Sequence, residues 1–143
     1  MKTKELKIQV PEGYEIDKEN STFECIKFKK KPVIIMDIMD EYGKKRNYPI
    51  KVLATSNTHM HKILAINSLI LVAKYLNEGW VPNFNNSEEP KYFVATTSGN
   101  TVYIEKVYGF NASVVYFKTN ELAIQAIDIL GEETIRLALS PNY

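Results

Sequence analysis

Residues 114–139, VVYFKTNELAIQAIDILGEETIRLAL, contain an apolar strand that is followed at once by an amphipathic helix. Residues 114–117 are β-branched or aromatic, which favours a strand. Thr119 is a suitable N-cap residue, and Gly131 stands where a left-handed C-cap belongs. A strand and a helix joined this closely have to pack together, so the stretch predicts a helix lying on a sheet.

The segment before this unit has the pattern of an antiparallel meander. Short runs of β-branched and aromatic residues are separated by turn formers at 97–100 and 108–111, which is typical of strands joined by short loops. The sequence predicts strands over 91–96, 101–107 and 113–118 and helices over 120–130 and 132–139.

A long helix is predicted in the middle of the chain. It begins at one of the three possible N-caps in residues 56–58 and runs to Asn77, and Gly79 ends it. Between Ile63 and Leu76 it is apolar on nearly all sides, so we expect it to be buried centrally.

The N-terminal third is more ambiguous. Residues 5–10 and 22–30 alternate polar and apolar side chains, which predicts two strands of a hairpin with a long loop. Residues 32–42 favour a strand by β-branching at 33–35 and a helix by apolar spacing, and we expect a helix. Together these elements predict an α+β fold, with a mostly antiparallel sheet and helices packed on one face.

The composition is that of one soluble domain. The chain has 143 residues, 45% of them hydrophobic and 24% charged, which fits a single domain over residues 1–143. Cys25 is the only cysteine, no secretory signal is evident, and the most apolar run is too short to cross a bilayer. We therefore expect a reducing, intracellular setting and no membrane.

Basic residues are concentrated in one segment. Residues 27–51 hold eight basic and three acidic side chains, and the remainder holds ten basic and fourteen acidic ones. We expect these lysines to keep an edge strand from pairing, because non-specific phosphate binders usually have a much larger basic excess, and contacts to phosphate are the alternative. The possible phosphate contacts are Lys29, Lys30, Lys31, Lys44, Lys45 and Arg46.

No catalytic or metal-binding pattern is present in the sequence. His59 and His61 lack the further ligands of a metal site, and Cys25 is expected to be a small buried hydrophobe in its strand. The acids in residues 37–41 suit a solvated helix face, and the loop 83–89 lacks the order of a calcium loop. We expect no catalytic residue, no metal and no cofactor, and hence a protein that is not an enzyme.

Aromatic residues are frequent in the second half of the chain. Some have to pack under the helices, and others are expected on an open sheet face or in a loop, where they suit recognition. We expect Trp80 and Phe84 to anchor their loop to the core, because a helix end that is followed by Trp-x-Pro usually needs a large anchor, and recognition is the alternative for these two residues. The candidate binding residues are Trp80, Phe84, Tyr92, Tyr103 and Tyr108.

Two resemblances follow from particular segments. Residues 113–131, SVVYFKTNELAIQAIDILG, resemble the third strand and second helix of RNA-recognition ferredoxin-like domains, although Ala112 and Val114 occupy the positions of the stacking aromatics. Residues 11–31, 74–93 and 115–139 resemble, in the same order, a group of small uncharacterised proteins of bacteriophages and prophages of gut bacteria. The second resemblance implies an accessory phage protein in the cytoplasm of a bacterial host.

These observations lead to one expectation and two alternatives. We expect a non-enzymatic module that binds a host or phage protein through its sheet face and the loop from Trp80 to Tyr92, as a homo-oligomer such as a homodimer. The first alternative is a weak nucleic-acid binder that uses the basic segment. The second is a phage sponge for a small signalling nucleotide, which needs a deep pocket lined by aromatics and lysines.

Overall fold

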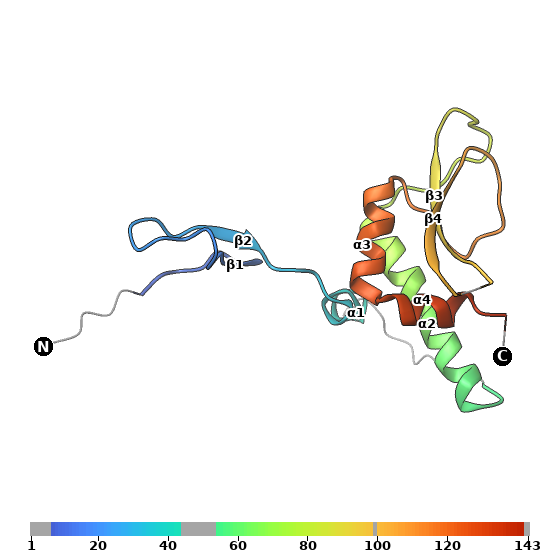
Figure 1. Cartoon of the computed structure of the whole chain (residues 1–143), viewed down its shortest axis with the longest axis horizontal. Helices are drawn as coiled ribbons and strands as arrows, with labels where there is room; N and C mark the ends of the chain where they lie inside the picture. The colour runs from blue at the N-terminus through green and yellow to red at the C-terminus, as the bar shows by residue number, and fades with distance from the viewer. Residues whose placement is uncertain (1–6, 44–53, 99, 142–143) are drawn as a thin grey trace, which may run out of the picture. The chain divides into compact units, whose positions relative to one another are not determined.

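The computed structural model describes residues 7–43, 54–98 and 100–141 (Figure 1). The chain divides into two compact units, unit 1 over residues 1–33 and unit 2 over residues 34–143, and each is described by itself. The single domain expected over residues 1–143 stays a prediction.

Unit 1 contains a small antiparallel hairpin. Its strands are β1, Tyr14–Ile16, and β2, Phe28–Lys30, and Tyr14 pairs with Lys30. The strand predicted over 5–10 is not present at residues 7–10, and β1 lies in the segment expected to be loop. A turn explains the shift: the Tyr14 N–H donates to the Pro11 oxygen over 3.1 Å, and Gly13 has φ +79°.

Polar contacts continue the hairpin beyond its strands. The Lys27 N–H donates to Ser21 Oγ over 2.9 Å, and the Cys25 N–H donates to Thr22 Oγ1 over 3.2 Å. The second of these bonds closes a turn, so only Phe28–Lys30 of the strand predicted over 22–30 is present. Cys25 is exposed, so the prediction that it is buried is wrong. No side chain among residues 7–33 is buried.

Unit 2 contains four helices in its described part, at or close to the predicted positions. They are α1, Ile35–Gly43; α2, Asn57–Leu76; α3, Asn120–Leu130; and α4, Glu132–Leu139. Residues 35–43 are thus helical, and the helix begins after the predicted position because the Ile34 N–H donates to Asp37 Oδ2 over 3.1 Å. Ser56 Oγ accepts the N–H of His59 at the start of α2, over 3.0 Å, and Thr119 Oγ1 accepts the N–H of Leu122 at the start of α3, over 3.3 Å.

Gly131 joins α3 to α4 in a conformation that differs from the predicted one. Its φ of 76° is positive as expected, but its ψ of 147° lies outside the left-handed helical region. The chain therefore turns sharply at Gly131, and α4 starts at the next residue in a new direction (Figure 1).

The sheet of unit 2 is a hairpin of β3, Lys91–Thr96, and β4, Val102–Val107. The third strand predicted over 113–118 is reduced to one antiparallel bridge between Phe117 and Tyr92. Phe117 therefore lies beside β3 and not beside β4, so the predicted meander order is wrong. On the edge of this segment that faces away from β3, the side chain of Asn77 bonds the backbone groups on either side of Phe117.

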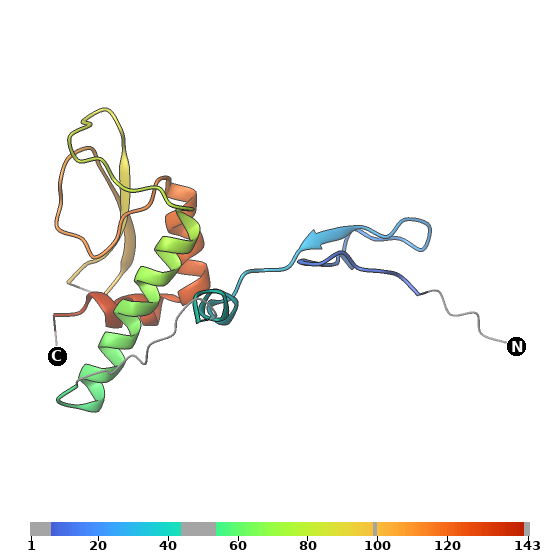
Figure 2. The same ribbon diagram turned by 180° about the vertical axis from the view of Figure 1, so that it is seen from behind.

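The core of unit 2 lies between the hairpin and the helices. α3 and α4 pack on the hairpin of β3 and β4, and Phe117 lies beside β3 at the edge of the sheet (Figures 1 and 2). Ala123 and Ala126 are fully buried on α3, where their small side chains let the helix approach closely. The predicted α+β fold is confirmed. The other core side chains include Leu69, Val72, Phe93, Val94, Phe117 and Ile135.

The prediction that α2 is buried centrally holds for one side only. Leu69 and Val72 are buried, whereas Met60, Leu64 and Ile70 are exposed. Across the described ranges, no helix combines the length and the apolar content that crossing a bilayer requires.

Candidate binding surface on two loops

Two loops meet at one end of the β3–β4 hairpin. Residues 77–90 connect α2 to β3, and residues 108–119 connect β4 to α3 (Figure 1). Both therefore emerge at the end of the hairpin that lies opposite its 97–101 turn. Four of the five candidate binding residues lie in these loops or next to them: Trp80, Phe84, Tyr92 and Tyr108.

Lys91 connects the two loops through hydrogen bonds from its side chain. Its side chain is fully buried, and Nζ donates to the carbonyl oxygens of Glu89, Asn86 and Tyr108 over 2.8, 3.1 and 3.4 Å. Nζ also lies 3.8 Å from the Glu89 carboxylate. A buried ammonium group needs such partners to offset its lost hydration. The loops therefore converge on one cation at the first residue of β3.

Aromatic rings form a second connection between the loops. Phe84 meets Phe110 at a centroid distance of 5.4 Å and Tyr116 at 5.2 Å, and Tyr116 meets Phe93 of β3 at 5.9 Å. All three contacts are edge-to-face, the arrangement that the ring quadrupoles favour. These contacts connect Phe84 and Phe110, one on each loop, to the buried Phe93 of β3. The two loops are therefore fixed to the core of unit 2.

Trp80 stabilises the base of the first loop. It is half-buried, and its Nε1–H donates to Glu89 Oε1 over 3.0 Å. Because Glu89 also contacts Lys91, the indole, the carboxylate and the ammonium group form one network. Trp80 therefore contributes to the shape of the loop more than to its exposed surface.

The two candidate tyrosines of the sheet lie on opposite faces. Tyr92 pairs with Lys106, and Tyr103 pairs with Ala95, so the two side chains alternate along the ladder. Lys106 Nζ lies 5.0 Å from the ring centroid of Tyr108 and 6.0 Å from that of Tyr92. Hydrogen bonding with Tyr108, and then the charges of Tyr108 and Tyr92, raise the pKa of Lys106. Tyr92 and Tyr108 are thus brought together, and Tyr103 is not part of this group.

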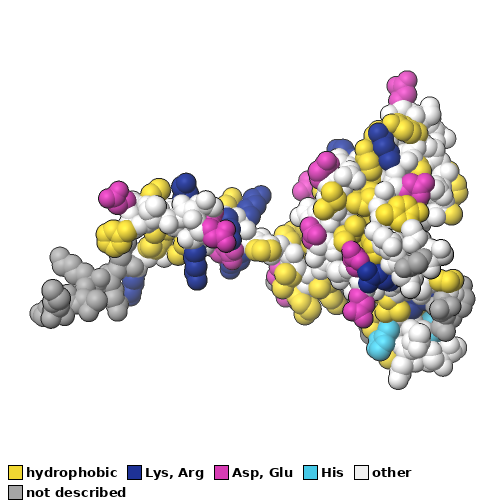
Figure 3. All heavy atoms as spheres, in the orientation of Figure 1, with side chains coloured by type: hydrophobic (Ala, Val, Ile, Leu, Met, Phe, Trp, Pro, Cys, Tyr) yellow, Lys and Arg dark blue, Asp and Glu magenta, His cyan; other side chains and the backbone are white. Residues whose placement is uncertain are grey.

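Apolar side chains remain exposed on the two loops. Val81 and Phe110 are each 77% exposed, Tyr108 is 46% exposed and Phe84 is 37% exposed. We call these four residues the two-loop surface. Figure 3 shows hydrophobic side chains on the outside of unit 2 over β3 and β4. Fixed loops that expose large apolar groups are typical of protein-binding surfaces.

Three of the predicted phosphate contacts lie at β2 in unit 1, and their role stays a prediction. Lys29, Lys30 and Lys31 are exposed at β2, and Lys29 Nζ lies 3.5 Å from Glu15 Oε1. The predicted contacts Lys44, Lys45 and Arg46 lie outside the described residues.

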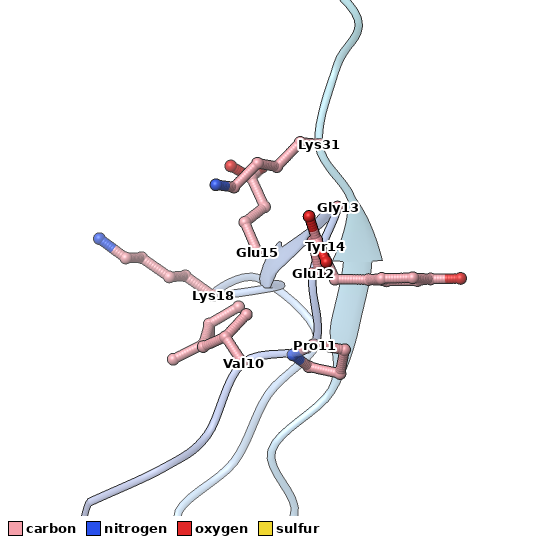
Figure 4. A pocket seen from close by; sticks show the side chains of 9 residues that line it. Val10, Pro11, Glu12, Gly13, Tyr14, Glu15, Lys18 and Lys31 are labelled. Carbon is pink, nitrogen blue, oxygen red and sulfur yellow. The ribbon is translucent and has the colours of Figure 1, made fainter.

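A shallow hollow of about 520 Å³ lies beside β1. It contains Lys18 and Lys31, but Glu12 and Glu15 line it as well. In Figure 4 the two lysines extend to one side, and the ring of Tyr14 points away from them. The hollow therefore does not combine a stacking ring with unopposed positive charge, which a nucleotide site needs. A second hollow, of about 840 Å³, lies between β3 and α4, and none of the described residues that line it is aromatic.

The histidines lie at the start of α2. His59 Nδ1 accepts the N–H of Thr55 over 3.1 Å, and His61 is exposed. Within the described ranges, no three His, Cys, Asp or Glu side chains converge as metal ligands would.

Sequence reasoning did not single out Lys91, Phe110 or Tyr116. A charged residue at the start of an otherwise apolar strand was the available signal for Lys91, but nothing in the sequence shows which carbonyl groups would surround it. Comparison with known proteins finds no protein family, no curated protein and no solved structure that the chain significantly matches.

Proposed function

We propose that the protein is a non-enzymatic module that binds another protein through the two-loop surface. The observation that carries the proposal is the exposure of Phe110. This ring is 77% exposed although it lies at the end of a packed series of aromatic rings. An exposed Phe costs hydration free energy unless a partner covers it.

The loops favour binding because they are already ordered. Lys91 holds backbone groups of both loops, and Trp80 and Glu89 fix the base of the first. A partner that binds such loops does not have to order them, so less of the gained free energy is lost as conformational entropy. Aromatic side chains in this setting are typical interaction hot spots.

We place the module in the cytoplasm of a bacterial host as a phage or prophage accessory protein, on the strength of the resemblance of residues 11–31, 74–93 and 115–139. A weak nucleic-acid binder and a nucleotide sponge are less well supported. Lys29 is already paired with Glu15, and the hollow at β1 holds two glutamates among its lysines.

The test compares two matched double variants with the wild-type chain. Val81→Gln/Phe110→Gln changes the two-loop surface, and Ile34→Gln/Ile124→Gln changes exposed apolar residues elsewhere on unit 2. Proteins captured from a bacterial extract are identified by mass spectrometry, and the affinity of each captured protein is measured by calorimetry. The loop variant should bind at least about tenfold more weakly, since a hot-spot residue contributes more than 1 kcal/mol. The control variant should bind as the wild type does.

Two results would contradict the proposal. One is a wild-type chain that enriches no protein relative to the loop variant. The other is a captured partner whose affinity falls equally in both double variants, because such a partner would not distinguish the two-loop surface from any other apolar residue.

A further inference from the structure

Strand β4 has one edge without a partner strand, because it pairs with β3 on one side only. Tyr92 of β3 directs both of its backbone groups to Phe117, so Tyr92 and its opposite residue Lys106 share no hydrogen bond. Bonded and non-bonded pairs alternate along an antiparallel ladder. The N–H and C=O groups of Val102, Ile104 and Lys106 therefore point away from β3 and form a row of donors and acceptors.

The outward groups of β4 specify the kind of partner that fits them. No hydrogen bond to the backbone of Val102, Ile104 or Lys106 is found within the described ranges. On the opposite side of the hairpin, Phe117 bridges to β3, and Asn77 bonds the backbone groups next to Phe117. An unpaired edge is a template for a further strand. Another extended segment satisfies all of its donors and acceptors at once.

One segment of the chain has a strand pattern but no strand partner. Residues 5–10 alternate polar and apolar side chains. Residues 7–10 nevertheless have no regular secondary structure, and no backbone hydrogen bond of theirs is found in the described part of the chain. Ile8 is 38% exposed and Val10 is 42% exposed. Pro11 ends the segment, since proline has no N–H to donate to a ladder.

This segment matches the edge of β4 in one antiparallel register. In that register a base faces an acid, and apolar residues face apolar residues. The opposite pairs are Lys7 with Glu105, Ile8 with Ile104, Gln9 with Tyr103 and Val10 with Val102. The outward backbone groups of Ile104 and Val102 are the ones that bond in this register. A shift by two residues separates Lys7 from Glu105, and a shift by one residue turns the apolar side chains to the other face.

Charge and strand direction support the same register. Neither Lys7 nor Glu105 forms an ion pair within the described residues. Opposite charges that face each other across a ladder are favourable, and like charges are unfavourable. A parallel segment with Lys7 beside Glu105 would place Ile8 beside Lys106. It would also carry Val10 past the end of β4. Only the antiparallel direction keeps both apolar contacts.

We infer that residues 7–10 of a second copy of this chain add an antiparallel strand to the outer edge of β4. A second copy supplies the strand because the described part of one chain leaves both the segment and the edge without partners. The contact also covers Ile8 and Val10, which belong to a segment, residues 7–33, that has no buried side chain of its own. A two-stranded hairpin gains stability when a further strand joins it.

The first test exchanges the paired charges and measures mass by sedimentation equilibrium on the full chain. The wild type should self-associate as its concentration rises. Lys7→Glu and Glu105→Lys should each raise the dissociation constant about threefold or more, because each places like charges opposite each other. Lys7→Glu/Glu105→Lys should restore the wild-type value. The control is Lys18→Glu/Glu105→Lys, which changes an exposed lysine outside the segment and should not restore it.

Two outcomes of this test would overturn the inference. One is a wild-type chain that stays monomeric at every concentration. The other is a Lys7→Glu/Glu105→Lys chain that associates no more tightly than the single variants.

The second test removes one outward backbone donor. Ile104→Pro deletes an N–H that points away from β3, and proline is tolerated at such edge positions. Self-association should weaken about fivefold or more through the lost hydrogen bond and its neighbours. Ile104→Val keeps the N–H and should associate as the wild type does. If Ile104→Pro folds and associates normally, the edge of β4 is not the contact. If it does not fold, the charge exchange decides.

The third test separates pairing between copies from pairing within one chain. In a Cys25→Ser background, chains that carry Lys7→Cys are mixed with chains that carry Glu105→Cys under mild oxidation. Facing residues of a non-bonded pair approach closely enough for a disulfide, so the mixture should form dimers with one chain of each kind. Neither chain should link to itself. Absence of mixed dimers, or a chain with both cysteines that closes only as a monomer, would overturn the role of a second copy.

Discussion

The side chain of Asn77 donates a hydrogen bond from Nδ2 to the carbonyl oxygen of Tyr116 over 2.8 Å. Its Oδ1 accepts the N–H of Lys118 over 3.1 Å. Between these two groups, Phe117 exchanges both of its backbone hydrogen bonds with Tyr92 over 2.7 and 3.0 Å. One amide at the end of α2 therefore takes the place of a neighbouring strand and fixes the segment that leads into α3.

Replacing Asn77 with alanine should destabilise unit 2. The variant leaves the part-buried Tyr116 carbonyl and the exposed Lys118 N–H without their partner, and the unsatisfied carbonyl costs about 1–3 kcal/mol. Urea unfolding should show a lower midpoint with an unchanged slope. Asn85→Ala, at an exposed loop position, should change the free energy of unfolding by no more than about 0.5 kcal/mol. Equal effects of the two variants would contradict the role of Asn77.

Most of the helices could be predicted from the sequence because their signals are local. Ser56 and Thr119 are caps whose effect depends on a residue three positions later, and both form the expected contact. The strand over 113–118 could not be placed correctly, because its partners are distant in the sequence: it pairs with Tyr92 at Phe117, and Asn77 lies 39 positions from Tyr116. A propensity for strand does not say which edge the strand will join.

Tyr116→Phe should leave unit 2 equally stable or make it more stable. The hydroxyl of Tyr116 is buried, and no hydrogen-bond partner for it exists within the described ranges. Removing a buried polar group without a partner recovers its desolvation cost, on the order of 1 kcal/mol, and the ring contacts with Phe84 and Phe93 persist. Thermal unfolding provides the measurement, with Tyr103→Phe as the exposed control. A clear loss of stability would show that the hydroxyl has a partner.

Lys91→Met should destabilise the two loops although the side chain keeps its length. The variant loses the hydrogen bonds to the carbonyl groups of Glu89, Asn86 and Tyr108, and we expect a cost of at least about 2 kcal/mol. Trp80 is the only tryptophan in the chain, so its fluorescence reports the loop directly. The exposed Lys118→Met is the control, and an unchanged Trp80 emission in Lys91→Met would refute the role of the ammonium group.

Only part of the arrangement around these loops could be predicted from the sequence. Tyr92 and Tyr108 were predicted as candidates, and Lys106 brings them together because it pairs across the ladder with Tyr92. The burial of Lys91 was not predictable, since lysine is almost never fully buried and its partners are backbone carbonyls. Every residue has a backbone carbonyl group, so the sequence does not show which of them will surround Lys91.

Asn20→Ala should raise the pKa of Asp17. The side-chain amide of Asn20 donates to Asp17 Oδ2 over 2.8 Å, and this hydrogen bond is the main reason that the pKa of Asp17 lies below its ordinary value. Because folding lowers this pKa, the contact stabilises the hairpin above the ordinary carboxyl pKa and is lost as the pH falls through the folded value. An NMR titration of Asp17 measures the shift. Glu24→Ala should leave the titration unchanged.

Gly131→Ala should destabilise the junction between α3 and α4. At φ 76° and ψ 147°, the backbone lies in a region that residues with a Cβ rarely adopt, and forcing alanine into it costs about 1–3 kcal/mol. A Cβ at Gly131 would meet no atom within 4 Å, so the cost is conformational and not steric contact with neighbours.

Gly109 is the matched control for this substitution. A Cβ there would also meet no atom within 4 Å, but the φ of Gly109 is not positive. Gly109→Ala should therefore leave the free energy of unfolding within about 0.5 kcal/mol of the wild type, or raise it slightly by restricting the unfolded chain. Urea unfolding of both variants separates the two effects. If Gly131→Ala is as stable as Gly109→Ala, the sharp turn between α3 and α4 does not depend on glycine.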